Sequence, residues 1–92
     1  MRELVRTSAF KRCLKRLARR RWNLDPLAAV IQKLAVDAPA TALFKDHALS
    51  GNFANKRECH VTSVTDDWVL VYHKQGNELY LHATGTHADV FG

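Results

Sequence analysis

The sequence predicts an α+β domain in which two antiparallel helices pack on one face of a mostly antiparallel four-stranded sheet, in the order β-α-α-β-β-β. Three observations lead to this prediction. Two early segments carry apolar residues at helical spacing, three later segments are rich in β-branched and aromatic residues, and 92 residues suit one small domain. The chain is 47% hydrophobic and 25% charged, as folded proteins usually are, so we expect residues 1–92 to form a single domain.

The first helix is predicted to follow a short strand. Residues 2–7 form that strand around Leu4 and Val5, and Ser8 then caps the free backbone N–H groups at the start of the helix. The buried stripe of the helix, at i, i+4 and i+7, consists of Phe10, Leu14 and Leu17. The rest of its surface is basic and consists of Lys11, Arg12, Lys15, Arg16, Arg19 and Arg20.

A second helix is predicted to begin at Asp25 and Pro26, because the carboxylate caps the helix and proline at the first position loses no hydrogen bond. Pro39 marks its end, and its apolar stripe consists of Leu27, Val30, Ile31 and Leu34. Residues 38–55 are then expected to form a loop.

Three further strands are predicted over residues 57–62, 68–73 and 79–84, with a turn at residues 75–77 that favours a meander. Alternation along the first of them places Glu58 and His60 on one face of the sheet and Cys59 on the other. The helices cover one face, so the opposite face is expected to stay free for a ligand.

The charge of the chain is unevenly distributed. Residues 1–21 hold nine Lys and Arg against one acid, a net charge of +8, whereas residues 22–92 hold five against eight, a net charge of −3. A basic block of this kind suits a polyanion such as RNA or an acidic protein partner, and equally a solvated helix surface.

Neither a signal peptide nor a membrane span is predicted, because no long apolar run occurs, and we expect a cytoplasmic protein without a membrane partner. Cys13 and Cys59 lack a C-x-x-C spacing and are expected to be reduced thiols without a redox role.

The candidate chemistry lies in four short motifs of the C-terminal half, KDHALSG, RECHV, DDWVLVY and ATGTHADVFG. Cutting RNA without a metal requires a base for the ribose 2′-hydroxyl, an acid for the leaving 5′-oxygen and positive charge at the phosphate. Imidazole suits all three tasks, because its neutral and charged forms coexist near neutral pH. Composition alone would favour polar surface roles for the histidines, and we keep that interpretation for His73 and His82.

These motifs, in this order, resemble the YafQ group of RelE-like toxins from type II toxin-antitoxin systems. The resemblance implies a RelE-like fold and a toxin that cleaves mRNA on the ribosome and inhibits translation, without a cofactor, with an antitoxin protein as partner. The positions that match the family's catalytic residues are His47, His60, Asp67 and His87. His60 and His47 would be the base candidates and His87 the acid.

The resemblance also implies residues that contact the substrate. Trp68 and Phe91 match aromatic residues of the family's site, where they would stack on bases, and Glu58 matches a nearby acid. Lys45, Arg57 or a protonated histidine could supply the positive charge at the phosphate where the family has an arginine and this chain has Ala83. No metal site is expected, because the Cys and His residues lack a zinc-site spacing.

Three departures from the family pattern stand out. Ala83 replaces a common arginine before TGTH and removes an expected phosphate-binding cation. The segment from Thr62 to Asp66 is about two residues longer than in the family, which can displace Asp67. Ala48 replaces a common proline after His47, which should loosen that loop.

Two alternatives remain at this point. A ParE-like toxin of the same superfamily inhibits DNA gyrase without cutting RNA, and that branch is not expected to carry this set of histidines. A catalytically weakened relic that still binds RNA or its antitoxin is the other alternative, and Ala83 is the residue that favours it.

Overall fold

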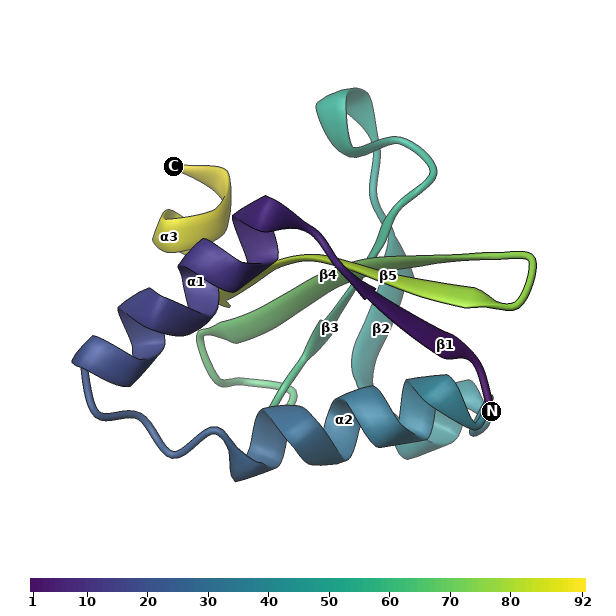
Figure 1. Ribbon diagram of the computed structural model, residues 1–92, viewed down its shortest axis with the longest axis horizontal. Coiled ribbons are helices and arrows are strands. Elements are labelled where there is room, and N and C mark those ends of the chain that lie inside the picture. The colour runs from purple at the N-terminus through teal and green to yellow at the C-terminus, as the bar shows by residue number, and fades with distance from the viewer.

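The computed structural model describes residues 1–92 as three helices on a five-stranded sheet. The helices are α1 (Ser8–Arg19), α2 (Asp25–Ala35) and the short α3 (His87–Phe91). The strands are β1 (Glu3–Arg6), β2 (Phe44–Ala48), β3 (Arg57–His60), β4 (Trp68–Gln75) and β5 (Glu78–Thr86). Helices α1 and α2 run in roughly opposite directions, and α2 lies along one side of the sheet (Figure 1). The predicted α+β class is confirmed.

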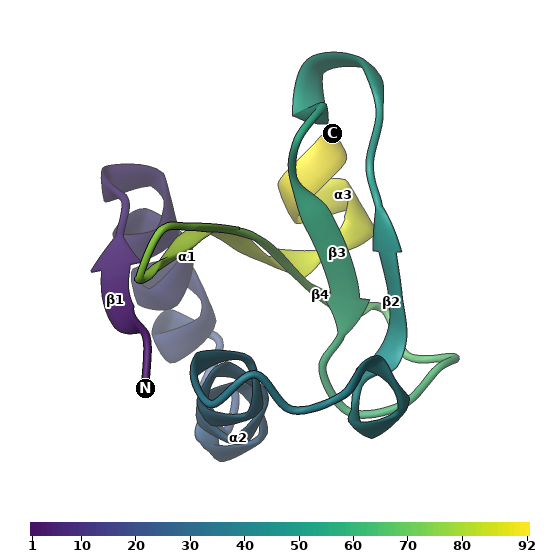
Figure 2. The same cartoon turned by 90° about the vertical axis from the view of Figure 1, so that its right-hand side faces the viewer.

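The strands follow the order β1-β5-β4-β3-β2 across the sheet (Figure 2). Strand β1 pairs parallel to β5, and the other neighbouring pairs are antiparallel. The predicted meander of the last three strands is therefore present, and the sheet is mostly antiparallel. The predicted number of four strands was wrong, because β2 adds a fifth at the edge.

Strand β2 lies inside the segment that the sequence predicted to be a loop. It pairs with β3 through Phe44 opposite His60 and His47 opposite Glu58, with an irregularity between these pairs where Lys45 has a φ of 52°. Two short 3-10 turns flank it, at residues 40–42 and 51–53. This strand owes its conformation to the β3 edge, because its own sequence, FKDHA, lacks the alternation of a half-buried strand.

Helices α1 and α2 pack on one face of the sheet and form the core with it. Thr7 caps α1, because its hydroxyl accepts the N–H of Phe10 at 3.1 Å, so the predicted cap at Ser8 is one residue late. Pro26 lies in the first turn of α2 as predicted. The core includes Phe10, Leu17, Leu27, Val30 and Leu34 from the helices, and Cys59, Leu70, Tyr72, Leu79 and Leu81 from the sheet.

The alternation in β3 is confirmed. Cys59 faces the core and is fully buried, and this burial raises the pKa of its thiol to about 12, so the thiol stays protonated at neutral pH. Cys13 and Cys59 are both free thiols. Glu58 and His60 alternate with Cys59 and therefore face the other side, which we call the open face. None of the helices has the length and apolarity needed to cross a membrane.

Helix α3 is fixed in place at the end of β5. Thr86 and Asp89 form a capping box, and Gly85 has a φ of 142° with so little room that an added Cβ would lie 2.8 Å from Asp89 Oδ2. Arg20 of α1 binds Asp89 in bidentate fashion, at 2.6 and 2.9 Å. Glycine at position 85 therefore allows the turn that brings His87 back over the open face.

Candidate active site

Three histidines surround one oxygen of Glu58. The Nε2 atoms of His47, His60 and His87 lie 3.6, 3.7 and 3.4 Å from Glu58 Oε1. These residues come from β2, β3 and the start of α3, so the antiparallel pairing of β2 with β3 and the turn at Gly85 together build the cluster. Glu58, which the resemblance gave as a nearby acid, is 4% exposed and lies between the three imidazoles.

His87 is held by Asp67. Asp67 Oδ1 lies 2.5 Å from His87 Nδ1 and also accepts the backbone N–H of His87 at 3.0 Å. The hydrogen bond to Asp67 raises the pKa of His87 above its ordinary value, and the negative charges of Glu58 and Asp67 add to this effect. The same hydrogen bond lowers the pKa of Asp67. The pair therefore favours a protonated His87 beside an ionised Asp67. The longer segment before Asp67 does not keep this carboxylate from reaching His87.

His60 faces a second aspartate that the sequence analysis did not select. Its Nδ1 atom lies 3.2 Å from Asp66 Oδ1, and both atoms are buried without a hydrogen bond. The other oxygen of Asp66 accepts the backbone N–H of Thr62 at 2.9 Å. Two adjacent acids, Asp66 and Asp67, thus serve two different histidines. The paired acids before Trp68 were visible in the sequence, but only the fold assigns one to each imidazole.

His47 is the third imidazole, and 46% of its side chain is exposed, as is also true of His87. Its Nδ1 atom lies 3.2 Å from the carbonyl oxygen of Ala48, so this nitrogen carries the hydrogen in the neutral ring. The lone pair of neutral His47 is then on Nε2, the atom that faces Glu58. His60, by contrast, is 4% exposed and lies beneath the two accessible rings.

The two predicted aromatic residues lie in different places. Phe91 is 39% exposed, its ring centre is 6.2 Å from that of His87, and it packs edge-on against Phe53. Trp68 is instead buried on the helix side of the sheet, where it contacts Trp22 and donates to Thr84 Oγ1 at 2.9 Å. The prediction that Trp68 stacks on a base is therefore wrong for this structure, whereas Phe91 borders the cluster.

The predicted cations do not reach the cluster. Arg57 points to the opposite face, where it binds Asp46 at 2.9 Å, and Lys45 is exposed on the irregular part of β2. Ala83 pairs with Val71, which in turn pairs with Glu58, so an arginine at position 83 would lie beside the cluster. The ion pairs of Glu58, Asp66 and Asp67 are all with histidines. The cluster itself therefore contains imidazole rings and no Lys or Arg side chain.

The same cluster has the geometry of a metal site. One donor atom each from Glu58, His60 and His87 lie within 4.8 Å of one another. Two imidazoles and a carboxylate suit a transition metal such as copper or zinc. The linear spacing of the Cys and His residues gave no such indication, because these three ligands come from distant parts of the chain.

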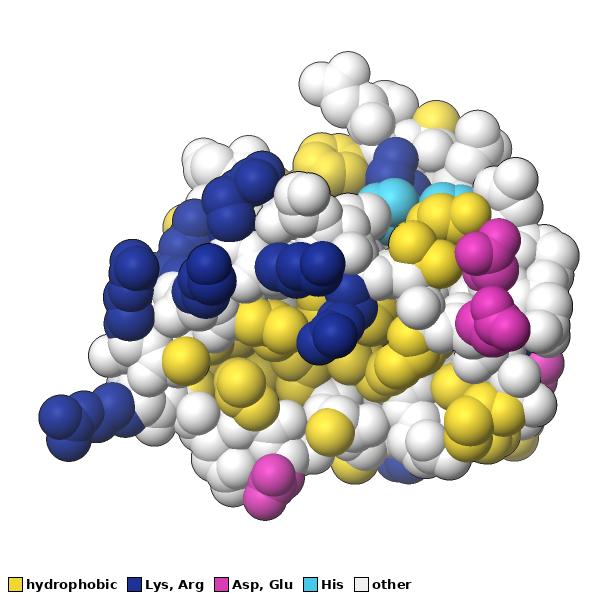
Figure 3. Space-filling view, in the orientation of Figure 1, with side chains coloured by type: hydrophobic (Ala, Val, Ile, Leu, Met, Phe, Trp, Pro, Cys, Tyr) yellow, Lys and Arg dark blue, Asp and Glu magenta, His cyan; other side chains and the backbone are white.

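A strongly basic surface covers α1, as the sequence predicted. Lys and Arg side chains gather over this helix (Figure 3) and surround a hollow of about 500 Å³. The residues that line it are Arg12, Lys15, Arg16, Arg19 and Arg20. Arg20 pairs with Asp89 at 2.6 Å and Arg16 pairs with it at 3.7 Å, and we call these five residues the basic surface.

The chain was compared with known families and structures. The family model described as the bacterial toxin of type II toxin-antitoxin system, YafQ, matches residues 2–92. The mRNA interferase toxin YafQ of Escherichia coli K12 is 29% identical over 92 residues, which cover 99% of this chain and 97% of that one.

Solved structures agree with this match. A copper-bound variant of a toxin from Helicobacter pylori is 31% identical, with a TM-score of 0.86 over 99% of this chain and 100% of that one. The toxin in the E. coli DinJ-YafQ toxin-antitoxin complex is 29% identical, with a TM-score of 0.82 over 99% of this chain and 98% of that one. The similarity thus extends over nearly the whole chain.

Proposed function

We propose that this chain, which belongs to the YafQ family of bacterial toxins of type II toxin-antitoxin systems, is an endoribonuclease that cleaves mRNA by acid/base catalysis at the histidine cluster. Its E. coli relative carries the name mRNA interferase. The observation that carries the proposal is the convergence of three imidazoles, from three separate elements, on one buried carboxylate oxygen. Such a set supplies a base, an acid and transferable positive charge in one place.

His47 is the proposed base. It is accessible, and the carbonyl of Ala48 leaves the lone pair of its neutral ring on Nε2. This nitrogen takes the proton of the ribose 2′-hydroxyl, and the 2′-oxygen forms a new bond to phosphorus. Glu58 then stabilises the imidazolium that results, because its oxygen is 3.6 Å from the protonated nitrogen.

His87 is the proposed acid. Asp67 holds Nδ1 and raises the pKa of the ring, so that Nε2 carries a proton near neutral pH. This proton passes to the 5′-oxygen as the bond between phosphorus and that oxygen breaks. The products are a 2′,3′-cyclic phosphate and a free 5′-hydroxyl, which balances protons and electrons without any co-reactant.

The buried histidine has a supporting role in this scheme. His60 lies against Asp66 and Glu58, with its ring centre 5.5 Å from that of His87, and in its protonated form it would place positive charge below the bound phosphate. It replaces part of the cation lost at Ala83. Phe91 borders His87 and offers an exposed ring face to a base.

Partners follow from the family and from the surface. The relative in the solved complex is bound to the antitoxin DinJ, and we propose an antitoxin protein as the partner of this chain as well. The basic surface attaches the toxin to RNA of the ribosome through phosphate contacts, with mRNA as the substrate. The protein would act in the cytoplasm, where ribosomes translate, and it would need no cofactor.

The test is cleavage of a translated mRNA by toxin separated from its antitoxin. We expect cuts that end in a 2′,3′-cyclic phosphate, also in the presence of EDTA, because the proton transfers need no metal. Added Cu²⁺ should inhibit, since it would occupy nitrogens of His60 and His87. Activity that EDTA abolishes and metal restores would contradict the mechanism, and gyrase inhibition without cleavage would contradict the function.

A further inference from the structure

A second group of ring side chains lies on the sheet near the β4–β5 hairpin. The rings of His73 and Tyr80 are stacked, with centres 4.5 Å apart and planes 8° apart. His82 lies beside them, with its ring centre 4.8 Å from that of His73 and its plane turned by only 13°. All three side chains are half-buried, and none belongs to the hydrophobic core. We call these three residues the ring cluster.

The rings of the ring cluster lie nearly parallel to one another. His73 Nδ1 and His82 Nε2 are 2.6 Å apart and share a hydrogen bond, which holds the two imidazoles side by side in nearly one plane. Burial, together with the positive charges of His73 and Lys56, lowers the pKa of His82 to about 4, so His82 is neutral at pH 7. The two imidazoles and the phenol ring stacked on His73 therefore present aromatic faces.

The strand register places the ring cluster on the same face as the active site. Glu58 pairs with Val71, and Val71 pairs with Ala83. His73 is two residues beyond Val71, so its side chain leaves the sheet on the same side, about 7 Å further along the strand. Neighbouring nucleotides of a single RNA strand can span such a step. The ring cluster therefore continues the surface on which the scissile phosphate would lie.

A cationic hollow accompanies the rings. A hollow of about 440 Å³ lies at this end of the sheet, and its lining includes His73 with Lys56 and Lys74. Lys74 already pairs with Asp37, which leaves the ammonium of Lys56 for a phosphate. Aromatic faces beside a free cation are the combination by which proteins bind single-stranded RNA, with stacking for bases and charge for the backbone.

We propose that the ring cluster, with Lys56, forms a subsite that stacks on the base of a nucleotide next to the scissile phosphate. The inference rests on the proposed function, because the ligand is the RNA strand cut at the neighbouring site. It assigns a binding role to His73 and His82, for which the sequence favoured a plain surface role. It also explains how a site without an arginine at position 83 retains its substrate.

The test measures binding of a single-stranded RNA whose 2′-O-methyl groups prevent cleavage, over a range of salt concentrations. Tyr80→Leu should weaken binding about 5- to 100-fold, the effect of losing one stacked base, without changing the dependence on salt. Tyr80→Phe is the matched control, since it keeps the ring, and it should bind like the wild type. Lys56→Gln should instead reduce the salt slope by about 0.7, as expected for one lost phosphate contact.

An abasic residue placed at successive positions of the RNA identifies the nucleotide involved. One position should weaken binding to the wild type and have little effect on Tyr80→Leu, because the stacking partner is already gone. Thermal midpoints of the variants show that each one is folded. In parallel, all proteins are assayed for cleavage of translated mRNA, in which Tyr80→Leu should raise KM and leave kcat nearly unchanged.

The outcomes separate the two proposals. If the wild type cleaves mRNA but Tyr80→Leu and Lys56→Gln both bind RNA like the wild type, the subsite is wrong and the proposed function stands. If Tyr80→Leu loses affinity for the antitoxin and keeps it for RNA, the ring cluster is an antitoxin contact and the proposal is also wrong. If the wild type neither binds nor cleaves RNA, both proposals fail.

Discussion

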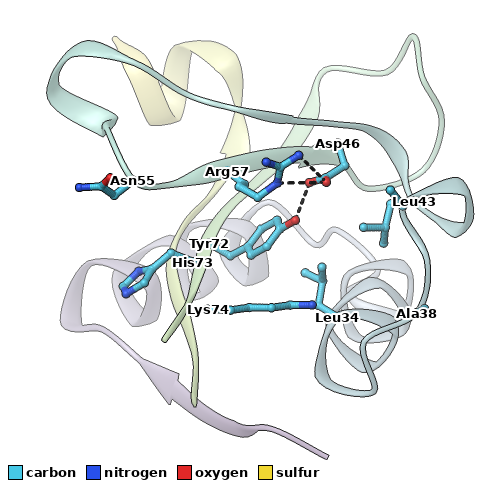
Figure 4. Close-up of a pocket in the computed structure, with 10 residues that line it drawn as sticks. Leu34, Ala38, Leu43, Asp46, Asn55, Arg57, Tyr72, His73 and Lys74 are labelled. Carbon is cyan, nitrogen blue, oxygen red and sulfur yellow. Dashed lines mark hydrogen bonds and ion pairs between the residues drawn. The ribbon is translucent and has the colours of Figure 1, made fainter. Parts of the chain in front are cut away.

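Two polar clusters lie on opposite faces of the sheet at β2 and β3, and they differ in how completely their charges are paired. On the helix side, Asp46 accepts hydrogen bonds from Arg57 and Tyr72 (Figure 4). On the open face, Glu58 is surrounded by imidazoles. Each cluster is built around a carboxylate that is largely buried, and residues next to each other in the sequence, such as Asp46 and His47, belong to different clusters.

The Asp46 cluster is closed. One carboxylate oxygen accepts two N–H groups of Arg57, at 2.9 and 3.1 Å, and the other accepts the hydroxyl of Tyr72 at 2.5 Å. Burial and the neighbouring carboxylate raise the pKa of Tyr72, so its hydroxyl remains a donor. Both oxygens of Asp46 accept hydrogen bonds, so this cluster holds the edge of the sheet together and leaves no free carboxylate oxygen for a substrate.

The Glu58 cluster is open. Its three nearest nitrogens are 3.4 to 3.7 Å from one oxygen, which is longer than an ordinary hydrogen bond, and two of the three rings are half exposed. None of these three nitrogens is held to Glu58 by a short hydrogen bond, which suits the proton transfers proposed for His47 and His87. The comparison thus distinguishes a polar cluster paired by short hydrogen bonds from the cluster that we propose to be catalytic.

The largest expected effect comes from breaking the open cluster. His87→Ala removes the proposed acid and should lower the cleavage rate about 10²- to 10⁴-fold. The half-exposed position should leave the free energy of unfolding within about 0.5 kcal/mol of the wild type. Single-turnover cleavage and thermal unfolding of the same protein check this. If the variant cleaves at nearly the wild-type rate, His87 is not the acid. If the variant is inactive because it is unfolded, His87 has a structural role.

Breaking the closed cluster should have the opposite result. Asp46→Ala leaves the Tyr72 hydroxyl and the Arg57 guanidinium without their acceptor and should destabilise the protein by about 1–3 kcal/mol. The rate constant kcat, measured well below the unfolding temperature, should stay within a few-fold of the wild type. Denaturant unfolding and kcat are the two measurements. A large loss of kcat in a folded variant would show that the closed cluster positions His47.

Asp67→Asn should change the pH dependence of cleavage, because Asp67 belongs to the Glu58 cluster through its hydrogen bond to His87. The pKa of His87 is raised by Asp67, so its acid form persists to higher pH than that of an ordinary histidine. Removal of the carboxylate charge lowers this pKa, and the alkaline limb of kcat/KM should move to lower pH. The rate should fall several-fold at slightly alkaline pH and less at pH 6. An alkaline limb that does not move would mean that another group is the acid.

The smallest expected effect comes from adding an arginine to the Glu58 cluster, as the Asp46 cluster already contains Arg57. Ala83→Arg places a guanidinium beside Val71 and Glu58, on the face where a phosphate would bind. We expect KM for mRNA to fall several-fold with little change in stability. Ala83→Gln, which has a long side chain without charge, is the control. An unchanged or higher KM would indicate that the new arginine pairs with Glu58 and closes the cluster.

The sequence by itself determined the elements whose signals are local. The spacing of Phe10, Leu14 and Leu17 and the start at Pro26 predicted both long helices, and alternation predicted the faces of β3. The order of the histidine motifs indicated the family, which the comparisons confirm. Helices and strand faces can be predicted from the sequence because their periods depend on residues only a few positions apart.

Only the tertiary structure decided which residues meet. Strand β2 forms because the edge of β3 pairs with it, and this pairing brings His47 to Glu58. The same pairing turns Arg57 toward Asp46 and away from the site where the sequence analysis had placed it. The assignment of Asp66 to His60 depends likewise on a register between distant segments. A one-residue shift in a strand exchanges its two faces, so no local pattern can fix which side chains share a cluster.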